Sequence, residues 1–181
     1  QGPGLRWLKT TRDFSSGSTG SSVFDFNGDG IAEVVYRDEC WLRVYSGPDG
    51  NKLFAAPVTS GTVQEEPVIA DTDGDGHAEI VVASDSAQNN RCKGSRSATE
   101  LGIKHPGATF GVHVYQDPQN RWMPSRKIWN QHAYHITHID DDGRVPLKQV
   151  ENWRSYNSFR KNVQGMGMGK PPLPDATGKV G

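Results

Sequence analysis

The sequence predicts an all-β fold assembled from short antiparallel strands joined by tight turns. Gly and Pro, at 21 and 11 of 181 residues, make almost a fifth of the chain, against roughly 12% in average proteins. Hydrophobic residues are only 34% of the sequence. A loop-and-strand segment also occurs twice. Repeated short strands with frequent turn signals are typical of antiparallel β architectures.

The repeat is the clearest feature of the chain. The segment VFDFNGDGIAEVV at residues 23–35 recurs as IADTDGDGHAEIV at residues 69–81, 46 positions later. Downstream, residues 42–45 match residues 112–115 at an offset of 70, so the second unit carries 24 extra residues. We expect this excess at residues 86–109, as a surface loop between two strands.

Each unit begins with an aromatic residue that lies 17 or 18 positions before an aspartate loop, namely Trp7, Phe54 and Trp122. Strands rich in β-branched residues follow the loops at residues 33–36 and 79–83. The predicted organisation is a β domain at residues 1–164, with units at 7–51, 52–121 and a divergent 122–163, followed by a Gly/Pro-rich tail or linker at 165–181.

One stretch has helical character. Apolar residues recur every three positions between residues 147 and 163. This spacing suits a short or partly 3₁₀ helix better than a long α-helix, because a straight α-helix would rotate such a stripe steadily around its axis. We expect the segment to cover a sheet.

The aspartate loops predict calcium sites. Ca²⁺ prefers six to eight oxygen ligands, and side chains at alternate positions of a tight turn can converge on one ion. Positions one, three, five and nine offer side-chain oxygens, and position seven offers its backbone carbonyl. The expected ligands of two ions are Asp25, Asn27, Asp29, Ile31 and Glu33 in the first loop, and Asp71, Asp73, Asp75, His77 and Glu79 in the second.

An EF-hand is excluded, because its bidentate glutamate stands at position twelve between two helices. Tyr36 and Val82 occupy that position here, and the flanking sequence is strand-like. The alternative to an ion site is a pair of solvated acidic turns.

The third unit retains only part of the pattern. If Asp142 takes position five, positions one and nine fall on His138 and Pro146. Asp140 and Asp142 form a possible weak third site, and a simple turn is favoured. His132, His135 and His138 are spaced by three, a spacing that converges poorly on one ion from either a strand or a helix.

The two cysteines, Cys40 and Cys92, form one disulfide or remain two unpaired thiols, because sequence separation alone cannot place their Cβ atoms. A disulfide would tether the predicted inserted loop, which contains Cys92. It would also fit an oxidising compartment.

Composition and motifs exclude several classes of function. A net charge of −1, with basic and acidic residues spread along the chain, gives no field that would attract nucleic acid. No apolar run approaches the ~18 residues of a membrane span. The usual hydrolase and nucleotide-binding motifs are absent, so we expect no enzyme.

At the two aspartate loops the sequence resembles the FG-GAP or VCBS repeat family, the calcium-loop repeats of integrin-type β-propellers and of bacterial surface proteins. The resemblance covers about residues 20–120. It implies four-stranded propeller blades, of which a closed ring needs roughly four to eight. Three recognisable units imply a hidden fourth, or a propeller completed elsewhere. Residues 126–163 more loosely resemble a segment of large secreted bacterial adhesin-like proteins.

The favoured function is a noncatalytic calcium-binding module of a secreted or cell-surface bacterial protein, serving adhesion, matrix or surface assembly, or glycan or protein binding. Its partners would be an extracellular protein or glycan, the rest of a larger parent chain, or neighbouring subunits. One alternative is a fragment of a secreted carbohydrate-active lyase or hydrolase using His132, His135, Asp140 and Asp142. Another is a subunit of an extracellular filament or surface layer.

Overall fold

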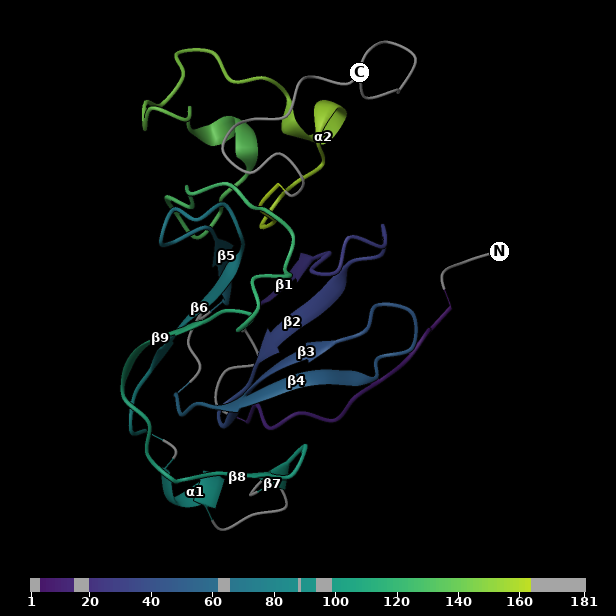
Figure 1. Ribbon diagram of the computed structural model, residues 1–181, viewed down its shortest axis with the longest axis vertical. Coiled ribbons are helices and arrows are strands. Elements are labelled where there is room, and N and C mark those ends of the chain that lie inside the picture. The colour runs from purple at the N-terminus through teal and green to yellow at the C-terminus, as the bar shows by residue number, and fades with distance from the viewer. Residues whose placement is uncertain (1–3, 15–19, 62–65, 88, 94–98, 164–181) are drawn as a thin grey trace. The chain divides into compact units, whose positions relative to one another are not determined.

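The structure is a computed structural model that describes residues 4–14, 20–61, 66–87, 89–93 and 99–163 (Figure 1). Its regular structure is mostly strand. The helices within those residues are short, namely α1 (Asn89–Lys93), the 3₁₀ helix η1 (Ile136–His138) and α2 (Asn152–Ser155). The predicted all-β class is confirmed. No helix in the described part of the chain is long and apolar enough to cross a bilayer.

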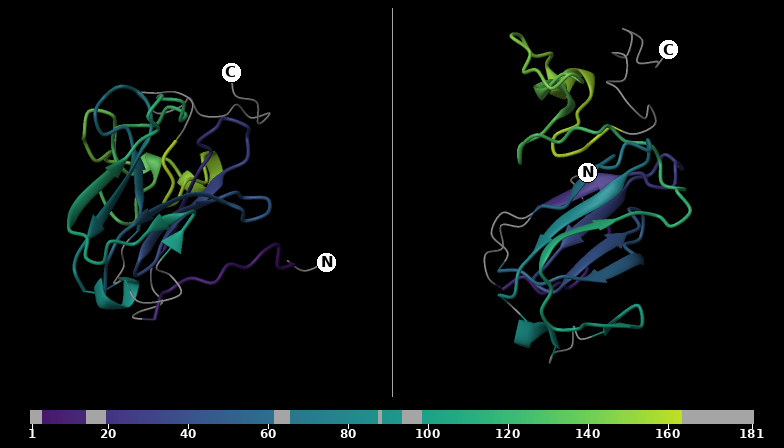
Figure 2. Two further views of the ribbon diagram at one scale, coloured as in Figure 1. Left: turned by 60° about the horizontal axis from the view of Figure 1, so that its bottom comes forward. Right: turned by 60° about the vertical axis from the view of Figure 1, so that its left-hand side comes forward.

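The first sheet has the order β1 (Ser21–Phe24), β2 (Glu33–Arg37), β3 (Trp41–Tyr45) and β4 (Lys52–Pro57). These strands lie side by side in Figure 1 and in both views of Figure 2. β3 is antiparallel to both neighbours, with Val44 opposite Val35 on β2 and Phe54 on β4. All five residues of β3 are buried. The strand therefore buries a charged residue, Arg43, which needs a partner.

The second sheet repeats this arrangement with β5 (Val68–Ala70), β6 (Glu79–Ser84) and β9 (Gly111–Tyr115), and β6 lies between the other two. One aspartate loop joins β1 to β2, and the other joins β5 to β6. The described residues add no fourth strand to this sheet. The sequence repeat is therefore also a repeat of strand order.

The inserted segment at residues 86–109 contains regular structure as well as loop. Besides α1, it forms a hairpin of β7 (Thr99–Glu100) and β8 (Ile103–Lys104). Leu101 and Gly102, with φ of 47° and 79°, give the two-residue turn the left-handed backbone that matches strand twist. The prediction of a plain surface loop was therefore incomplete.

The inserted segment is held by a disulfide and a buried histidine. Cys40 and Cys92 are bonded, with an S–S distance of 2.04 Å. His105 donates from Nε2 to the Cys40 carbonyl at 2.8 Å, and its Nδ1 accepts from the Gly107 amide at 3.0 Å. The ring also meets Trp41 edge-on, with 5.1 Å between centroids. These contacts give the segment a fixed place beside β3.

The chain divides into two compact units. The first comprises residues 1–23, 30–67 and 81–114, and the second comprises residues 24–29, 68–80 and 115–181. The second aspartate loop lies wholly inside the second unit. The first loop is divided, with residues 25–29 in the second unit and residues 30–33 in the first.

The helix expected at residues 147–163 is limited to the four residues of α2. The apolar side chains of the stripe do not cover a sheet as expected. Tyr156 is half-buried, and the other four are exposed, each above 40% of its full accessibility: Leu147, Val150, Trp153 and Phe159. The predicted tail at residues 165–181 lies outside the described residues.

Asp38 organises the turn between β2 and β3. Its Oδ1 accepts from the backbone amides of Cys40 and Trp41, both at 2.8 Å. Its Oδ2 accepts from the Arg12 amide at 2.8 Å and pairs with the Arg43 guanidinium at 2.5 Å. Burial alone would lower the pKa of Arg43, but Asp38 and Glu100 raise it above its ordinary value. The arginine is therefore buried as a cation.

We expect Asp38→Asn to destabilise the fold by about 1.5–3 kcal/mol, because it removes the nearer of the two carboxylates that pair with the buried Arg43 and leaves only Glu100, at 3.1 Å. Urea unfolding measures the change. Asp49→Asn, in the exposed turn between β3 and β4, is the matched control and should change stability by less than about 0.5 kcal/mol. Equal effects of the two variants would contradict this account of Asp38.

The disulfide should stabilise the fold by lowering the conformational entropy of the unfolded chain. For a sequence separation of 52, chain-entropy arguments give a stabilisation of about 4 kcal/mol. The double variant Cys40→Ala with Cys92→Ala should lose a comparable free energy of unfolding. An unchanged denaturant midpoint in the double variant would show that the inserted segment is held without the covalent bond.

Candidate metal centre

The second aspartate loop folds around the Asp71 carboxylate. Asp71 is buried, and its Oδ1 accepts from the Gly74 amide at 2.6 Å while its Oδ2 accepts from the Gly76 amide at 3.1 Å. Gly74 and Gly76 have φ of 85° and 96°, a left-handed backbone that glycine adopts without cost from a Cβ. The two glycines therefore let the chain close tightly around Asp71.

Glu79, the first residue of β6, brings a second buried carboxylate to this loop. Its Oε2 accepts from the Thr72 amide at 2.6 Å and from the Thr72 hydroxyl at 2.9 Å. Its Oε1 is buried without a hydrogen-bond partner among the described residues. Burial raises the pKa of Glu79, the bonds from Thr72 oppose that rise, and the charges of Asp73 and Asp75 add to it. One of the two carboxylate oxygens of Glu79, Oε1, therefore still lacks a hydrogen-bond partner.

A cation fits this need. One oxygen from each of Asp71, Asp73 and Glu79 lies within 4.8 Å of the others. Hard divalent cations such as Ca²⁺ bind clustered carboxylate oxygens, and Ca²⁺ tolerates irregular geometry. An unpartnered buried carboxylate oxygen is costly, and a cation removes that cost. The residues present therefore suit a hard cation held by oxygen ligands.

Asp75 and His77 lie outside this group of three. The Asp75 carboxylate accepts from the His77 amide at 2.8 Å and from the side chain of Asn120. The hydrogen bond from the His77 amide lowers the pKa of Asp75, and the bond from Asn120 adds to this effect. His77 donates from Nδ1 to the Trp122 carbonyl at 2.6 Å. Sequence reasoning missed Thr72 and Asn120 as partners of the loop.

The first loop has the same backbone design. Asp25 is buried, and its Oδ1 accepts from the Gly28 amide at 2.7 Å and from the Asp29 amide at 3.2 Å. Gly28 and Gly30 have φ of 75° and 85°. The Asn27 amide group donates to Asp29 Oδ2 at 3.1 Å. The structure thus brings Asp25, Asn27 and Asp29 together.

The other two predicted ligands of the first loop belong to the first compact unit. Ile31 is exposed, and Glu33 is buried at the first position of β2. Glu33 thus has the same place on its strand as Glu79 has on β6.

The third loop is a turn closed by its own backbone and by arginines. Asp140 accepts from the Gly143 amide at 2.9 Å, and its own amide donates to the Arg144 carbonyl at 2.8 Å. Asp142 pairs with Arg144 at 3.4 Å, and Asp141 pairs with the buried Arg126 at 2.5 Å. In the described part of the chain, neither Asp140 nor Asp142 belongs to a group of three ligating side chains.

The histidines near this turn pair with their neighbours. His135 and His138 stack with 3.5 Å between ring centroids. Burial lowers the pKa of His135, and the adjacent His138 lowers it further. His132 lies 3.1 Å from an Arg160 nitrogen. Among the described residues, these histidines form no group of three ligands.

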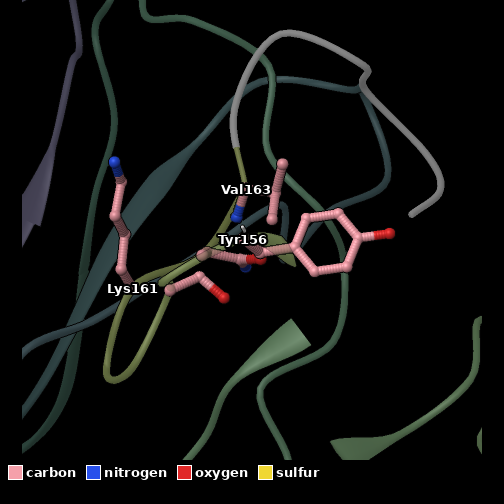
Figure 3. Close-up of a pocket in the computed structure, with 5 residues that line it drawn as sticks. Tyr156, Lys161 and Val163 are labelled. Atoms are coloured by element: carbon pink, nitrogen blue, oxygen red, sulfur yellow. Dashed lines mark hydrogen bonds between the residues drawn. The ribbon is translucent and has the colours of Figure 1, made fainter. Parts of the chain in front are cut away.

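A small cavity of about 120 Å³ lies beside α2 and is lined by Tyr156, Ser158, Lys161, Asn162 and Val163 (Figure 3). Asn162 donates from its amide group to the carbonyls of Ile69 and Arg126, at 2.9 and 2.8 Å. Its side-chain oxygen accepts from Tyr134 at 3.2 Å. Because Asn162 is engaged inside the fold, the second loop is the better candidate site.

Comparison with known proteins agrees with the repeat. A family model described as an FG-GAP-like repeat matches residues 25–82. The chain is similar to the crystal structure of the V. cholerae biofilm matrix protein Bap1, with 30% sequence identity and a TM-score of 0.70. The match covers 93% of this chain and 25% of Bap1, so the chain spans about a quarter of that protein's length. No curated protein matches the chain.

The matched residues include both aspartate loops, the strands β2 to β5 and the first four residues of β6. The chain therefore carries FG-GAP-like repeat sequence at residues 25–82, on an all-β fold that it shares with a bacterial biofilm matrix protein.

Proposed function

We propose that this chain is a noncatalytic calcium-binding module of a secreted or cell-surface bacterial protein, and that it serves matrix or surface assembly. The observation that carries the proposal is the second loop, where Glu79 keeps a buried carboxylate oxygen without a hydrogen-bond partner beside Asp71 and Asp73. The FG-GAP-like match and the likeness to a biofilm matrix protein support the same function.

The ion would act as a structural element. Asp71, Asp73 and Glu79 would hold it in the second loop. Asp25, Asn27 and Asp29 would hold its counterpart in the first. Bound Ca²⁺ supplies positive charge that offsets the repulsion among these carboxylates, and it stabilises the folded state because the unfolded chain has no assembled site.

An extracellular location has independent support. The Cys40–Cys92 disulfide is buried beside Trp41 and Ala55, and structural disulfides are typical of secreted proteins. Matrix assembly requires contacts with a glycan, a protein or neighbouring copies. Trp153, at 67% exposure, is the most exposed tryptophan of the described residues and offers a flat face to such a ligand. No specific observation favours the lyase or hydrolase alternative.

Calcium should raise the melting temperature. With about two ions bound, at a free concentration of 100 times Kd, each site adds about 2.7 kcal/mol. Melting the chain in millimolar Ca²⁺ and again in excess chelator measures the shift, and elemental analysis counts the ions. Identical melting curves with no bound metal would overturn the proposed sites.

Glu79→Gln should change the melting temperature in one direction without calcium, and it should change the gain from added calcium in the other. Without the ion, the variant should melt higher than the parent at neutral pH, because it removes a buried charge. With Ca²⁺, the variant should gain less stability than the parent, because it lost a ligand. Glu151→Gln, which removes an exposed carboxylate in the same unit, is the matched control and should change neither value.

The raised pKa of Glu79 sets the pH dependence of this effect. A carboxyl whose pKa is higher in the folded state contributes stability that is complete below its unfolded pKa. That contribution is lost as pH rises through the folded value. The advantage of Glu79→Gln without calcium should therefore vanish near pH 4 and grow toward neutral pH. An advantage that is constant with pH would assign the effect to packing.

A further inference from the structure

The first loop contains the only asparagine of the chain that is followed by glycine, Asn27–Gly28, among nine asparagines. Asn27 is exposed. Gly28 has φ of 75° and lacks the side chain that would shield its backbone nitrogen. The second loop has Asp73–Gly74 at the same positions. The two loops therefore differ in whether position three carries an amide or a carboxylate.

An exposed asparagine before glycine can react with its own backbone. The Gly28 nitrogen loses its proton to solvent and attacks Cγ of Asn27, the new C–N bond closes a five-membered succinimide, and the side-chain amide leaves as ammonia. Water then opens either C–N bond of the ring. The products are aspartate, or isoaspartate with the backbone routed through the side chain. Water is the sole co-reactant.

We propose that Asn27 is a site of spontaneous deamidation, and that occupancy of the first loop by a cation protects it. The protection rests on the proposed function, whereas the reactivity of Asn27 does not. The Asp29 amide donates to Asn27 Oδ1 at 2.9 Å, and this bond draws electrons away from the carbon that is attacked. The Gly28 amide donates to Asp25 Oδ1 at 2.7 Å, and this bond retains the proton that must leave.

A cation would change both conditions. Asn27 and Asp25 are predicted ligands, so a bound ion would restrain the Asn27 side chain directly, and it would restrain the Gly28 nitrogen through the Asp25 carboxylate that accepts its proton. Loss of the ion would leave a loop of clustered carboxylates that opens more readily, because their repulsion is no longer offset. The reaction would then report how long the loop has been empty.

The two products would have opposite effects on the site. Aspartate at position 27 would reproduce the ligand set of the second loop, where Asp73 stands, and an added carboxylate strengthens Ca²⁺ binding. Isoaspartate would lengthen the backbone between Asp25 and Asp29 and displace the ligands from one another.

Gly28 is favoured chiefly by its left-handed backbone. A Cβ at this position would lie 2.7 Å from the Met123 sulfur, and the left-handed backbone disfavours a larger residue. A residue other than glycine would therefore strain the backbone of the loop, and a Gly28 variant is a poor test of the reaction because it would change that backbone.

The test ages the purified full chain at mildly alkaline pH, in millimolar Ca²⁺ and in excess chelator, and measures each asparagine by peptide mass spectrometry in ¹⁸O-labelled water. In chelator, Asn27 should deamidate several times faster than Asn51. Asn51 is the internal reference, because it is exposed and donates to Asp49 in a similar turn but precedes Lys52. Calcium should slow the reaction at Asn27 and leave Asn51 unchanged.

Asn27→Asp supplies the aspartate product directly and should bind Ca²⁺ more tightly than the parent. Equal rates at Asn27 and Asn51 in chelator would overturn the proposed site. An Asn27 rate unchanged by Ca²⁺, while elemental analysis shows the ion bound, would overturn the protection. Rapid reaction at Asn27 in a chain that binds no Ca²⁺ would contradict the proposed function and support the modification site.

Discussion

The cost of burying carboxylates is the constraint on which this structure depends. Both aspartate loops and the turn between β2 and β3 bury acidic side chains, namely Asp25, Glu33, Asp38, Glu39, Asp71 and Glu79. A buried carboxylate is tolerated only where hydrogen bonds or opposite charge replace its water. Asp38 has both, from backbone amides and from Arg43. Glu79 has hydrogen-bond partners for one oxygen only, and the second loop is where we propose that a cation supplies the missing partner.

The loops could be found in the sequence because their design is local. Asp71 binds amides three and five residues ahead, and the glycines that permit those bonds are visible as letters. Contacts between residues far apart in the sequence produce no pattern of this kind. Asn120 meets Asp75, and the Trp122 carbonyl accepts from His77, over a sequence separation of 45 in each case. The spacing rule therefore predicts which residues share the loop, but it could not show that Asn120 and Trp122 contact that loop.

The spacing of apolar residues was a weaker predictor of structure in the C-terminal segment at residues 147–163, which forms no part of a sheet. The stripe at residues 147–163 has a spacing that fits neither helix nor strand closely, and the structure forms only α2 there, with the apolar residues exposed. The offset between the repeats predicts an inserted segment at residues 86–109. Its hairpin escaped notice because each strand has only two residues, too few for a periodic pattern.

The disulfide would limit how far this chain could extend under tension. Cys40 and Cys92 are 52 positions apart in sequence, but their Cα atoms are separated by 5.3 Å. When the chain is pulled from its ends, the residues between the two bonded cysteines cannot extend. At ~3.4 Å per extended residue, that removes on the order of 170 Å from the reach of the unfolded chain. Tension would pass through the covalent bond and bypass the second aspartate loop, which would be shielded from direct extension.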